Sequence, residues 1–169
     1  MKTKTASSTK AIMTEIVLPN DTNTLGNLMG GRLLHLMDIC SAISSHRCSN
    51  RIVVTASVNN VSFASPIKLG DIVTLESKVT RTFNSSMEVF IEVFVEDHRT
   101  GEKTLSNNAY YTFVAVDQIG TPIEVPNVTP ETEGEKKQFE GALRRRELSL
   151  ILAGKMKPEE ATELKKLFE

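Results

Sequence analysis

The feature that most constrains the fold is a turn-rich stretch that runs directly into an apolar one. Residues 20–31 are rich in Asn, Asp and Gly, which are typical of turns, whereas residues 32–45 contain neither Gly nor Pro. The second stretch is apolar almost all the way round, as expected of a helix that lies in a core rather than on a surface. We therefore predict a glycine-rich loop that leads into the N-terminus of a buried helix.

This loop and helix also carry chemistry. The first amides of a helix have no internal acceptor and lie at the positive end of the helix dipole. Gly30 and Gly31 would let an anion or a polarised carbonyl approach those amides closely. Asp38 lies two helical turns further on, among apolar residues, where a carboxylate needs a partner or a catalytic task. From the residues alone, a structural and a catalytic role for Asp38 are both open.

Length and charge limit the class of protein. A chain of 169 residues suffices for one domain with a substantial core, and a net charge of −1 argues against nucleic acid or a polybasic contact with a membrane. Cys40 and Cys48 lie in and beside the apolar stretch, which indicates buried thiols in a reducing compartment rather than a disulfide, metal pair or nucleophile. Residues 1–10 are polar and lack the apolar segment of a signal peptide, so we expect a flexible arm on a cytoplasmic protein.

The rest of the chain predicts an antiparallel sheet and a helical tail. Stretches rich in β-branched or alternating residues predict strands at 11–18, 51–64, 72–83, 87–97 and 103–116. Hairpin spacing between the last strands favours an α+β architecture, with the long helix laid across a five-stranded antiparallel sheet over residues 11–130. A helical extension is expected over 131–169. Apolar residues on the second sheet face and the open sheet edges favour a symmetric dimer.

Several segments in this order resemble the hotdog-fold acyl-CoA thioesterases, in the branch of the bacterial YciA-type enzymes and the cytosolic long-chain acyl-CoA hydrolases. The resemblance covers residues 11 to about 130 and fits the α+β architecture. The segments that carry it are Leu18–Gly31, Leu36–Ile43, Val53–Val58, Phe63–Asp71, Ser85–Val89 and Tyr111–Asp117.

The resemblance implies hydrolysis of acyl-CoA to fatty acid and CoA by a homohexamer built from three dimers, with active sites at the dimer interface. It implies that Asp38 is the catalytic carboxylate, that Asn27 is a second catalytic residue, and that Gly30 and Gly31 polarise the thioester carbonyl. No cofactor is implied, because CoA is part of the substrate. Asp38 lies about 11 Å along the helix from Gly31. We therefore expect each site to combine groups from two subunits.

Other residues have two open interpretations each. Five of them are candidates to bind CoA, although they could equally be turn residues, strand hydroxyls or a solvated charge: Arg51, Thr55, Ser57, Ser85 and Ser86. The run Arg144–Arg146 could meet the 3′-phosphate of CoA or form a solvated helix face. No metal constellation is visible among the three His and two Cys residues.

Two other functions stay open from the sequence. A protein of this fold could bind acyl-CoA or a fatty acyl group without catalysis. A hotdog dehydratase would use a His base, for which His35 is the candidate, and a His35–Asp38 dyad is a further alternative. The presence of both Asn27 and Asp38 favours hydrolysis.

Overall fold

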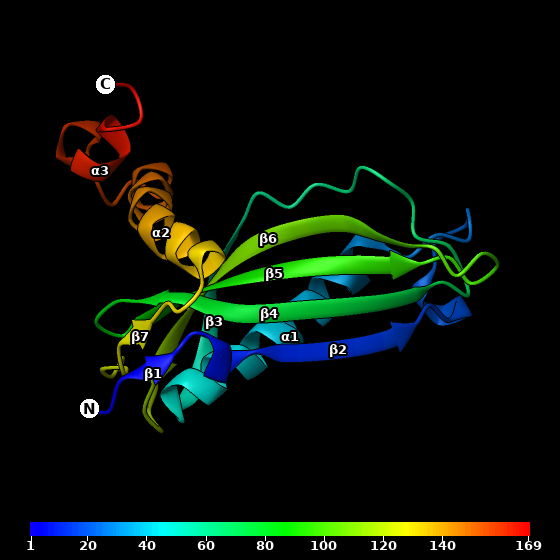
Figure 1. Ribbon diagram of the computed structural model, residues 1–169, viewed down its shortest axis with the longest axis horizontal. Coiled ribbons are helices and arrows are strands. Elements are labelled where there is room, and N and C mark those ends of the chain that lie inside the picture. The colour runs from blue at the N-terminus through cyan, green and yellow to red at the C-terminus, as the bar shows by residue number, and fades with distance from the viewer.

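The computed structural model describes residues 1–169 and consists of a curled sheet around one long helix, α1 (Gly30–Ser49), as Figure 1 shows. The main sheet is antiparallel and its strands lie in the order β2-β4-β5-β6-β3. The bounds are β2 (Ala11–Ile16), β3 (Ile52–Asn59), β4 (Ile72–Thr82), β5 (Ser86–Glu96) and β6 (Lys103–Val116). The predicted α+β hotdog architecture is confirmed.

The core lies between α1 and the concave face of the sheet. Alternate residues of each central strand face the helix and are almost completely buried, among them Leu75, Val89, Ile91, Val93, Tyr111 and Phe113. Burial of one such side chain contributes about 1.5–3 kcal/mol to folding. The helix ends at Ser49 and is capped by Asn50, which adopts a left-handed conformation with φ 53°. None of the helices combines the length and the apolarity needed to cross a bilayer.

The strand expected at 51–64 is shorter than the pattern suggested. The strand β3 ends at Asn59, and Asn60 follows with φ 54°, a left-handed conformation that turns the chain out of the sheet. The residues that follow form a long connection to β4. Before α1, the short helix η2 (Pro19–Asp21) opens the glycine-rich loop.

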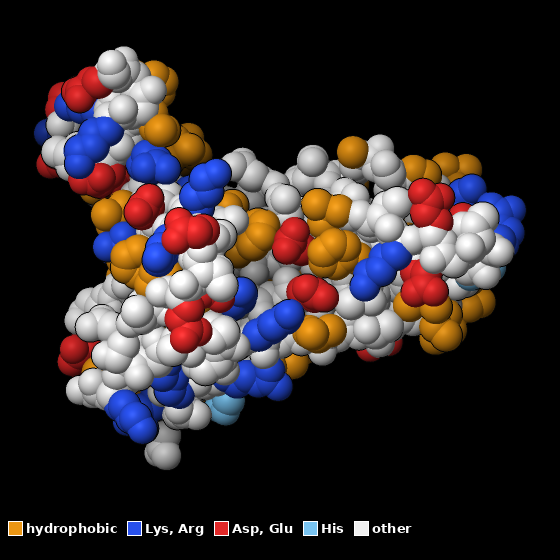
Figure 2. Space-filling model, in the orientation of Figure 1, with side chains coloured by type: hydrophobic (Ala, Val, Ile, Leu, Met, Phe, Trp, Pro, Cys, Tyr) orange, Lys and Arg blue, Asp and Glu red, His pale blue; other side chains and the backbone are white.

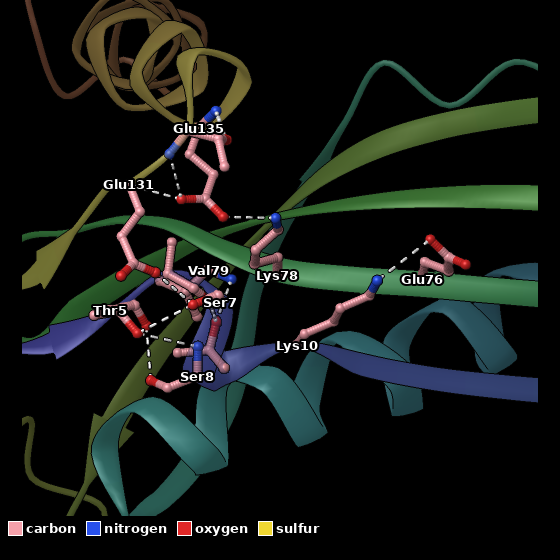
Figure 3. Close-up of polar contacts among 12 residues, drawn as sticks. Thr5, Ser7, Ser8, Lys10, Glu76, Lys78, Val79, Glu131 and Glu135 are labelled. Carbon is pink, nitrogen blue, oxygen red and sulfur yellow. Dashed lines mark hydrogen bonds and ion pairs between the residues drawn. The ribbon is translucent and has the colours of Figure 1, made fainter.

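The first ten residues, expected to be a flexible arm, are largely docked on the sheet. The strand β1 (Lys4–Thr5) pairs in parallel with β7 (Val128–Thr129), and the short helix η1 (Ser7–Thr9) follows. Thr9 is fully buried, and its hydroxyl accepts a hydrogen bond from the Val79 amide at 2.9 Å. Figure 3 shows the bond from Ser7 to Glu131. Polar side chains hold the segment in place. The polar composition of residues 1–10 therefore did not distinguish a docked segment from a flexible arm.

The helix α2 (Glu133–Leu152) crosses the outer face of the sheet, on the side opposite α1. Beyond it, η3 (Pro158–Glu160) and α3 (Thr162–Lys165) project from one end of the molecule (Figure 1). A capping box starts α2: the Thr132 hydroxyl accepts from the Glu135 amide, and the Glu135 carboxylate accepts from the Thr132 amide. The same Glu135 carboxylate pairs with Lys78 on β4 at 2.8 Å (Figure 3).

Charged and aromatic contacts, rather than a broad apolar face, fix α2 to the sheet. The guanidinium of Arg145 donates two hydrogen bonds to the buried carboxylate of Glu88, at 2.9 and 2.8 Å, and lies 4.0 Å from the centre of the Tyr110 ring. Arg81 stacks on Phe139 at 4.1 Å in the same way. Figure 2 shows apolar and charged side chains interspersed over this outer face. The helix α2, which we expected to be solvated or to face a partner, therefore packs in part against the sheet of its own chain.

We predict that Glu88→Gln lowers the free energy of unfolding by about 3 kcal/mol, because it leaves the Arg145 charge without its partner in a half-buried place. Urea unfolding at a fixed protein concentration measures this change. Glu92→Gln is the matched control, since Glu92 lies on the same strand face without an ion pair. Equal losses in the two variants would contradict the role given to Glu88.

Candidate active site

Asp38 and Thr55 form a direct pair between α1 and β3. The Thr55 hydroxyl donates a hydrogen bond to Asp38 Oδ1 at 2.6 Å. Asp38 is half-buried and Thr55 is exposed, so the pair lies at the border of the core and can be reached from outside. A short bond to a carboxylate oxygen fixes the orientation of that carboxylate. Thr55, predicted as a CoA contact, is thus found beside the predicted catalytic residue.

A β-bulge turns Thr55 and Ser57 to opposite faces of the sheet. The pairing between β3 and β6 passes from Thr55 opposite Phe113 to Ser57 opposite Thr112, which leaves Ala56 as an extra residue. Phe113 is buried against α1, so Thr55 shares the core face, and Ser57 is turned to the outer face. Bulges commonly re-aim side chains next to active sites.

Tyr111 adds a buried phenol near the carboxylate. Burial, together with the negative charge of Asp38, raises the pKa of Tyr111 to about 12. The Tyr111 hydroxyl donates to the Leu34 carbonyl at 3.1 Å, one turn before Asp38 on the helix. Tyr111 is therefore protonated at neutral pH and does not compete with Asp38 as a base.

A cavity lies at the start of α1, away from Asp38, and we call it the helix-start cavity. It measures about 370 Å³, and Asn23, Asn27, Gly30 and Phe63 are among its walls. The first amide of α1 with an acceptor in the chain is that of Leu33, so the amides of Gly30 and Gly31 stay available. A Cβ atom on Gly30 would come within 3.3 Å of the Phe63 ring, and glycine therefore suits this close approach.

The loop before α1 is shaped by an asparagine that the sequence analysis did not single out. The side-chain oxygen of Asn23 accepts from the amides of Leu25 and Asn27, at 2.9 and 3.2 Å. This leaves the NH₂ group of Asn23 free to act as a donor at the exposed end of the helix-start cavity. The ion pair between Asp21 and Arg32, at 2.9 Å, ties the loop to the helix.

Within one chain, the two parts of the predicted site are separate. Gly30 and Asn27 line the helix-start cavity, whereas Asp38 does not. The strand β3 beside Asp38 is the last strand of the sheet, and its free edge exposes the apolar residues Ile52 (55%), Val54 (47%) and Val58 (41%). A strand edge of this kind is a template for pairing with another chain.

The residues predicted to bind CoA are brought together only in part: Ser57 and Ser86 both lie near Arg146, whereas Arg51 and Thr55 lie elsewhere. Arg51 lies in a hollow with His46, which donates through Nδ1 to the Arg51 carbonyl at 3.1 Å. Ser57 lies on the outer face, and the hydroxyl of Ser86 accepts from Arg146 at 3.1 Å. The carbonyl of Ser85 accepts from the amide of Ala115 within the sheet.

A cationic pocket lies on the outer face between β3 and α2, with a volume of about 190 Å³. Its walls include Ser57, Phe83, Arg146 and Lys155. Arg146 stacks on Phe83 at 4.3 Å, and neither Arg146 nor Lys155 pairs with a carboxylate. The pocket therefore holds two uncompensated positive charges, one of which is fixed by an aromatic ring and a hydroxyl.

The remaining candidates contact neither Asp38 nor each other in a catalytic arrangement. Burial raises the pKa of both thiols, that of Cys48 to about 11, so neither is a thiolate at neutral pH. His35 is exposed, and Thr55 rather than His35 bonds Asp38. One group of potential metal ligands joins Asp71, Asp97 and His98, but His98 already pairs with Asp71 at 2.8 Å.

Comparison with known proteins points to one family. The model of the thioesterase superfamily matches residues 25–102. A Bacillus subtilis (strain 168) protein described as an uncharacterized acyl-CoA thioester hydrolase, YkhA, is 42% identical over 144 residues, which span 85% of this chain and 84% of that protein.

Two solved structures are also similar. A hexameric acyl-CoA thioesterase without ligand is 40% identical with a TM-score of 0.86, over 90% of this chain and 98% of that one. The acyl-CoA hydrolase from Staphylococcus aureus, solved with butyryl-CoA, CoA and CoA disulfide, is 35% identical with a TM-score of 0.82, over 90% and 95%. Variants of that enzyme with one Asn, Asp or Thr replaced by Ala have been solved as well. The chain therefore belongs to the thioesterase superfamily, among the acyl-CoA thioester hydrolases of the hotdog fold.

Proposed function

We propose that this protein hydrolyses acyl-CoA thioesters to the free acid and CoA, without a cofactor. The observation that carries the proposal is the hydrogen bond from Thr55 to Asp38, which orients a carboxylate beside an open strand edge. The hydrolases among its relatives support the substrate class. If the protein binds acyl-CoA but releases no thiol from it, it is a binding module of the same fold and the proposal is wrong.

In this mechanism the two separated places act on one substrate. The amides of Gly30 and Gly31, at the positive end of α1, hydrogen-bond the thioester oxygen and stabilise the oxyanion as it forms. Asp38 activates the attacking water as a general base, or attacks the carbonyl carbon itself to form a mixed anhydride that water then hydrolyses. In both cases Thr55 holds the Asp38 carboxylate in place. The thiolate of CoA leaves and takes up a proton. Because Asp38 does not line the helix-start cavity of its own chain, the two sets come from two subunits.

The second catalytic amide is better placed at Asn23 than at Asn27. In the S. aureus enzyme, the replaced Asp and Thr are separated by as many positions as Asp38 and Thr55 are here. The replaced Asn and Asp are separated by as many positions as Asn23 and Asp38. The free NH₂ group of Asn23 fits that role, and the backbone of Asn27 serves to hold the Asn23 side chain.

The proposed assembly is a dimer joined through β3, with three dimers forming a hexamer. Antiparallel pairing of two β3 edges would cover Ile52, Val54 and Val58 and join the two sheets into one. It would also bring α1 of one subunit close to the loop of the other. The hexameric thioesterases among the similar structures support the higher assembly.

We predict that Asp38→Asn lowers kcat for acyl-CoA hydrolysis by about 10²–10⁴-fold, because the variant keeps the shape but removes the charge that activates water. Thr55→Ala should lower kcat by about tenfold, since it loses only the orienting bond. Thiol release from butyryl-CoA, followed with a thiol-reactive dye, measures both. Thr74→Ala is the control, because Thr74 bonds only Thr14 on the far side of the sheet.

The same variants test whether the site is shared between subunits. Asp38→Asn and Asn23→Ala chains, refolded together, form mixed dimers with one intact and one doubly altered site. Activity should then recover to about a quarter of wild type, because random pairing makes about half of the dimers mixed. Verified mixed dimers without activity would place both residues in one chain's site and refute the shared arrangement.

We further propose that the cationic pocket binds the phosphates of CoA, through Arg146, Lys155 and Ser57. Arg146→Gln should raise KM for acyl-CoA about tenfold and leave kcat nearly unchanged, because a charge-assisted contact far from the reacting carbonyl is lost. Arg144→Gln is the matched control, since Arg144 does not line the pocket. Equal KM values for the two variants would rule the pocket out as the phosphate site.

A further inference from the structure

Asn107 is a half-buried residue of β6 whose side-chain amide has no hydrogen-bonding partner. It lies on β6, where the alternate residues Ala109, Tyr111 and Phe113 face α1, and it pairs directly with the buried Val93. Directly opposed residues share a sheet face, so Asn107 takes a place in this series that an apolar residue would normally fill. Its side-chain oxygen and nitrogen are both shielded from solvent, and neither has a partner in the chain.

The strand is built so that this amide points inward. The pairing of β5 with β6 passes from Phe94 opposite Leu105 to Val93 opposite Asn107, which leaves Ser106 as an extra residue. This bulge sets the face that Asn107 takes. A buried amide that makes no hydrogen bond is unfavourable, and native proteins leave few of them. The missing partner is therefore expected from outside the chain.

The position of Asn107 indicates what that partner is. Asn107 lines the helix-start cavity together with Gly30 and Leu33. Leu33 is buried, one turn into the helix, whereas Asn23 and Phe63 on the other walls are exposed to solvent. With the thioester oxygen on the Gly30 amide, the pantetheine arm leads out to solvent and the acyl group lies inward. Asn107 is then on the acyl side of the carbonyl, and its amide, shielded in the free chain, meets the acyl group when the side chain turns toward the cavity.

We propose that Asn107 is a specificity-determining residue that hydrogen-bonds a hydroxyl group on the acyl chain. The substrates favoured by this residue are hydroxyacyl-CoA thioesters, and the inference rests on the proposed thioesterase function. A hydroxyl both donates and accepts, as the carboxamide of Asn107 does. An unsubstituted acyl chain leaves that carboxamide unpaired in the complex. Sites built around a buried polar group discriminate strongly against ligands that leave it unpaired.

The experiment compares butyryl-CoA with 3-hydroxybutyryl-CoA. For wild type and Asn107→Leu, kcat/KM for both substrates is measured by thiol release under the same conditions. The ratio of the hydroxylated to the unsubstituted substrate should fall at least about tenfold in the variant. Asn108→Leu is the matched control, because Asn108 is the next residue and is exposed on the other face of the strand, and it should keep the wild-type ratio. Asn107→Ala, which cannot overfill the core, is measured in parallel.

The outcomes separate this inference from the function on which it rests. An unchanged ratio in folded Asn107→Leu or Asn107→Ala, with hydrolysis intact, would show that Asn107 is structural and would overturn the inference alone. A lower melting temperature without a change in the ratio leads to the same conclusion. Wild-type protein that hydrolyses neither substrate nor longer acyl-CoA thioesters would overturn the thioesterase function and this inference with it.

Discussion

Burial of α1 in the curl of the sheet is the constraint on which the rest of the structure depends. The sheet covers one side of the helix, whereas Gly31, His35 and Ile39 on the other side are exposed in the single chain, and packing of the covered side fixes both ends of the helix. The glycine-rich start is held against the loop by Phe63, and its amides remain unpaired. Asp38 lies beside β3, the last strand of the sheet, and is half-buried there. Its carboxylate can therefore be reached from solvent.

Much of the fold could be predicted from the sequence because its signals are local. Alternation of residues locates β4 and β5 to within about one or two residues, and the absence of Gly and Pro marks most of α1. The choice of Asp38 as a candidate catalytic residue also rests on a local pattern, since a carboxylate among the apolar residues of a helix is unusual. The short strand β1 has no such signal, because its two residues owe their conformation to a pairing with β7 far along the chain.

The arrangement of the site could be predicted less well, for a physical reason that recurs. Ser57 and Asn107 each follow a change of register, and a single extra residue exchanges the two faces of a strand. When the alternating pattern of a strand is continued past an extra residue, it assigns the side chains that follow to the wrong face of the sheet. The contact of Arg145 with Glu88 joins residues distant in sequence, so the charges of α2 look solvated until the sheet beneath them is known. The scatter of the predicted CoA residues has the same origin.

The bulge at Ala56 has a consequence for how this enzyme can diversify. Thr55 and Ser57 face opposite sides only while the number of residues in β3 stays fixed, so one insertion or deletion there would exchange the two environments. A change in the length of the connection between Asn60 and Asp71 would not exchange two faces in this way, although residues of this connection form several walls of the helix-start cavity. Loop length is therefore a free variable in evolution, and strand length is not. Descendants of this chain can acquire new acyl preferences by remodelling that connection while the chemistry beside Asp38 is inherited unchanged.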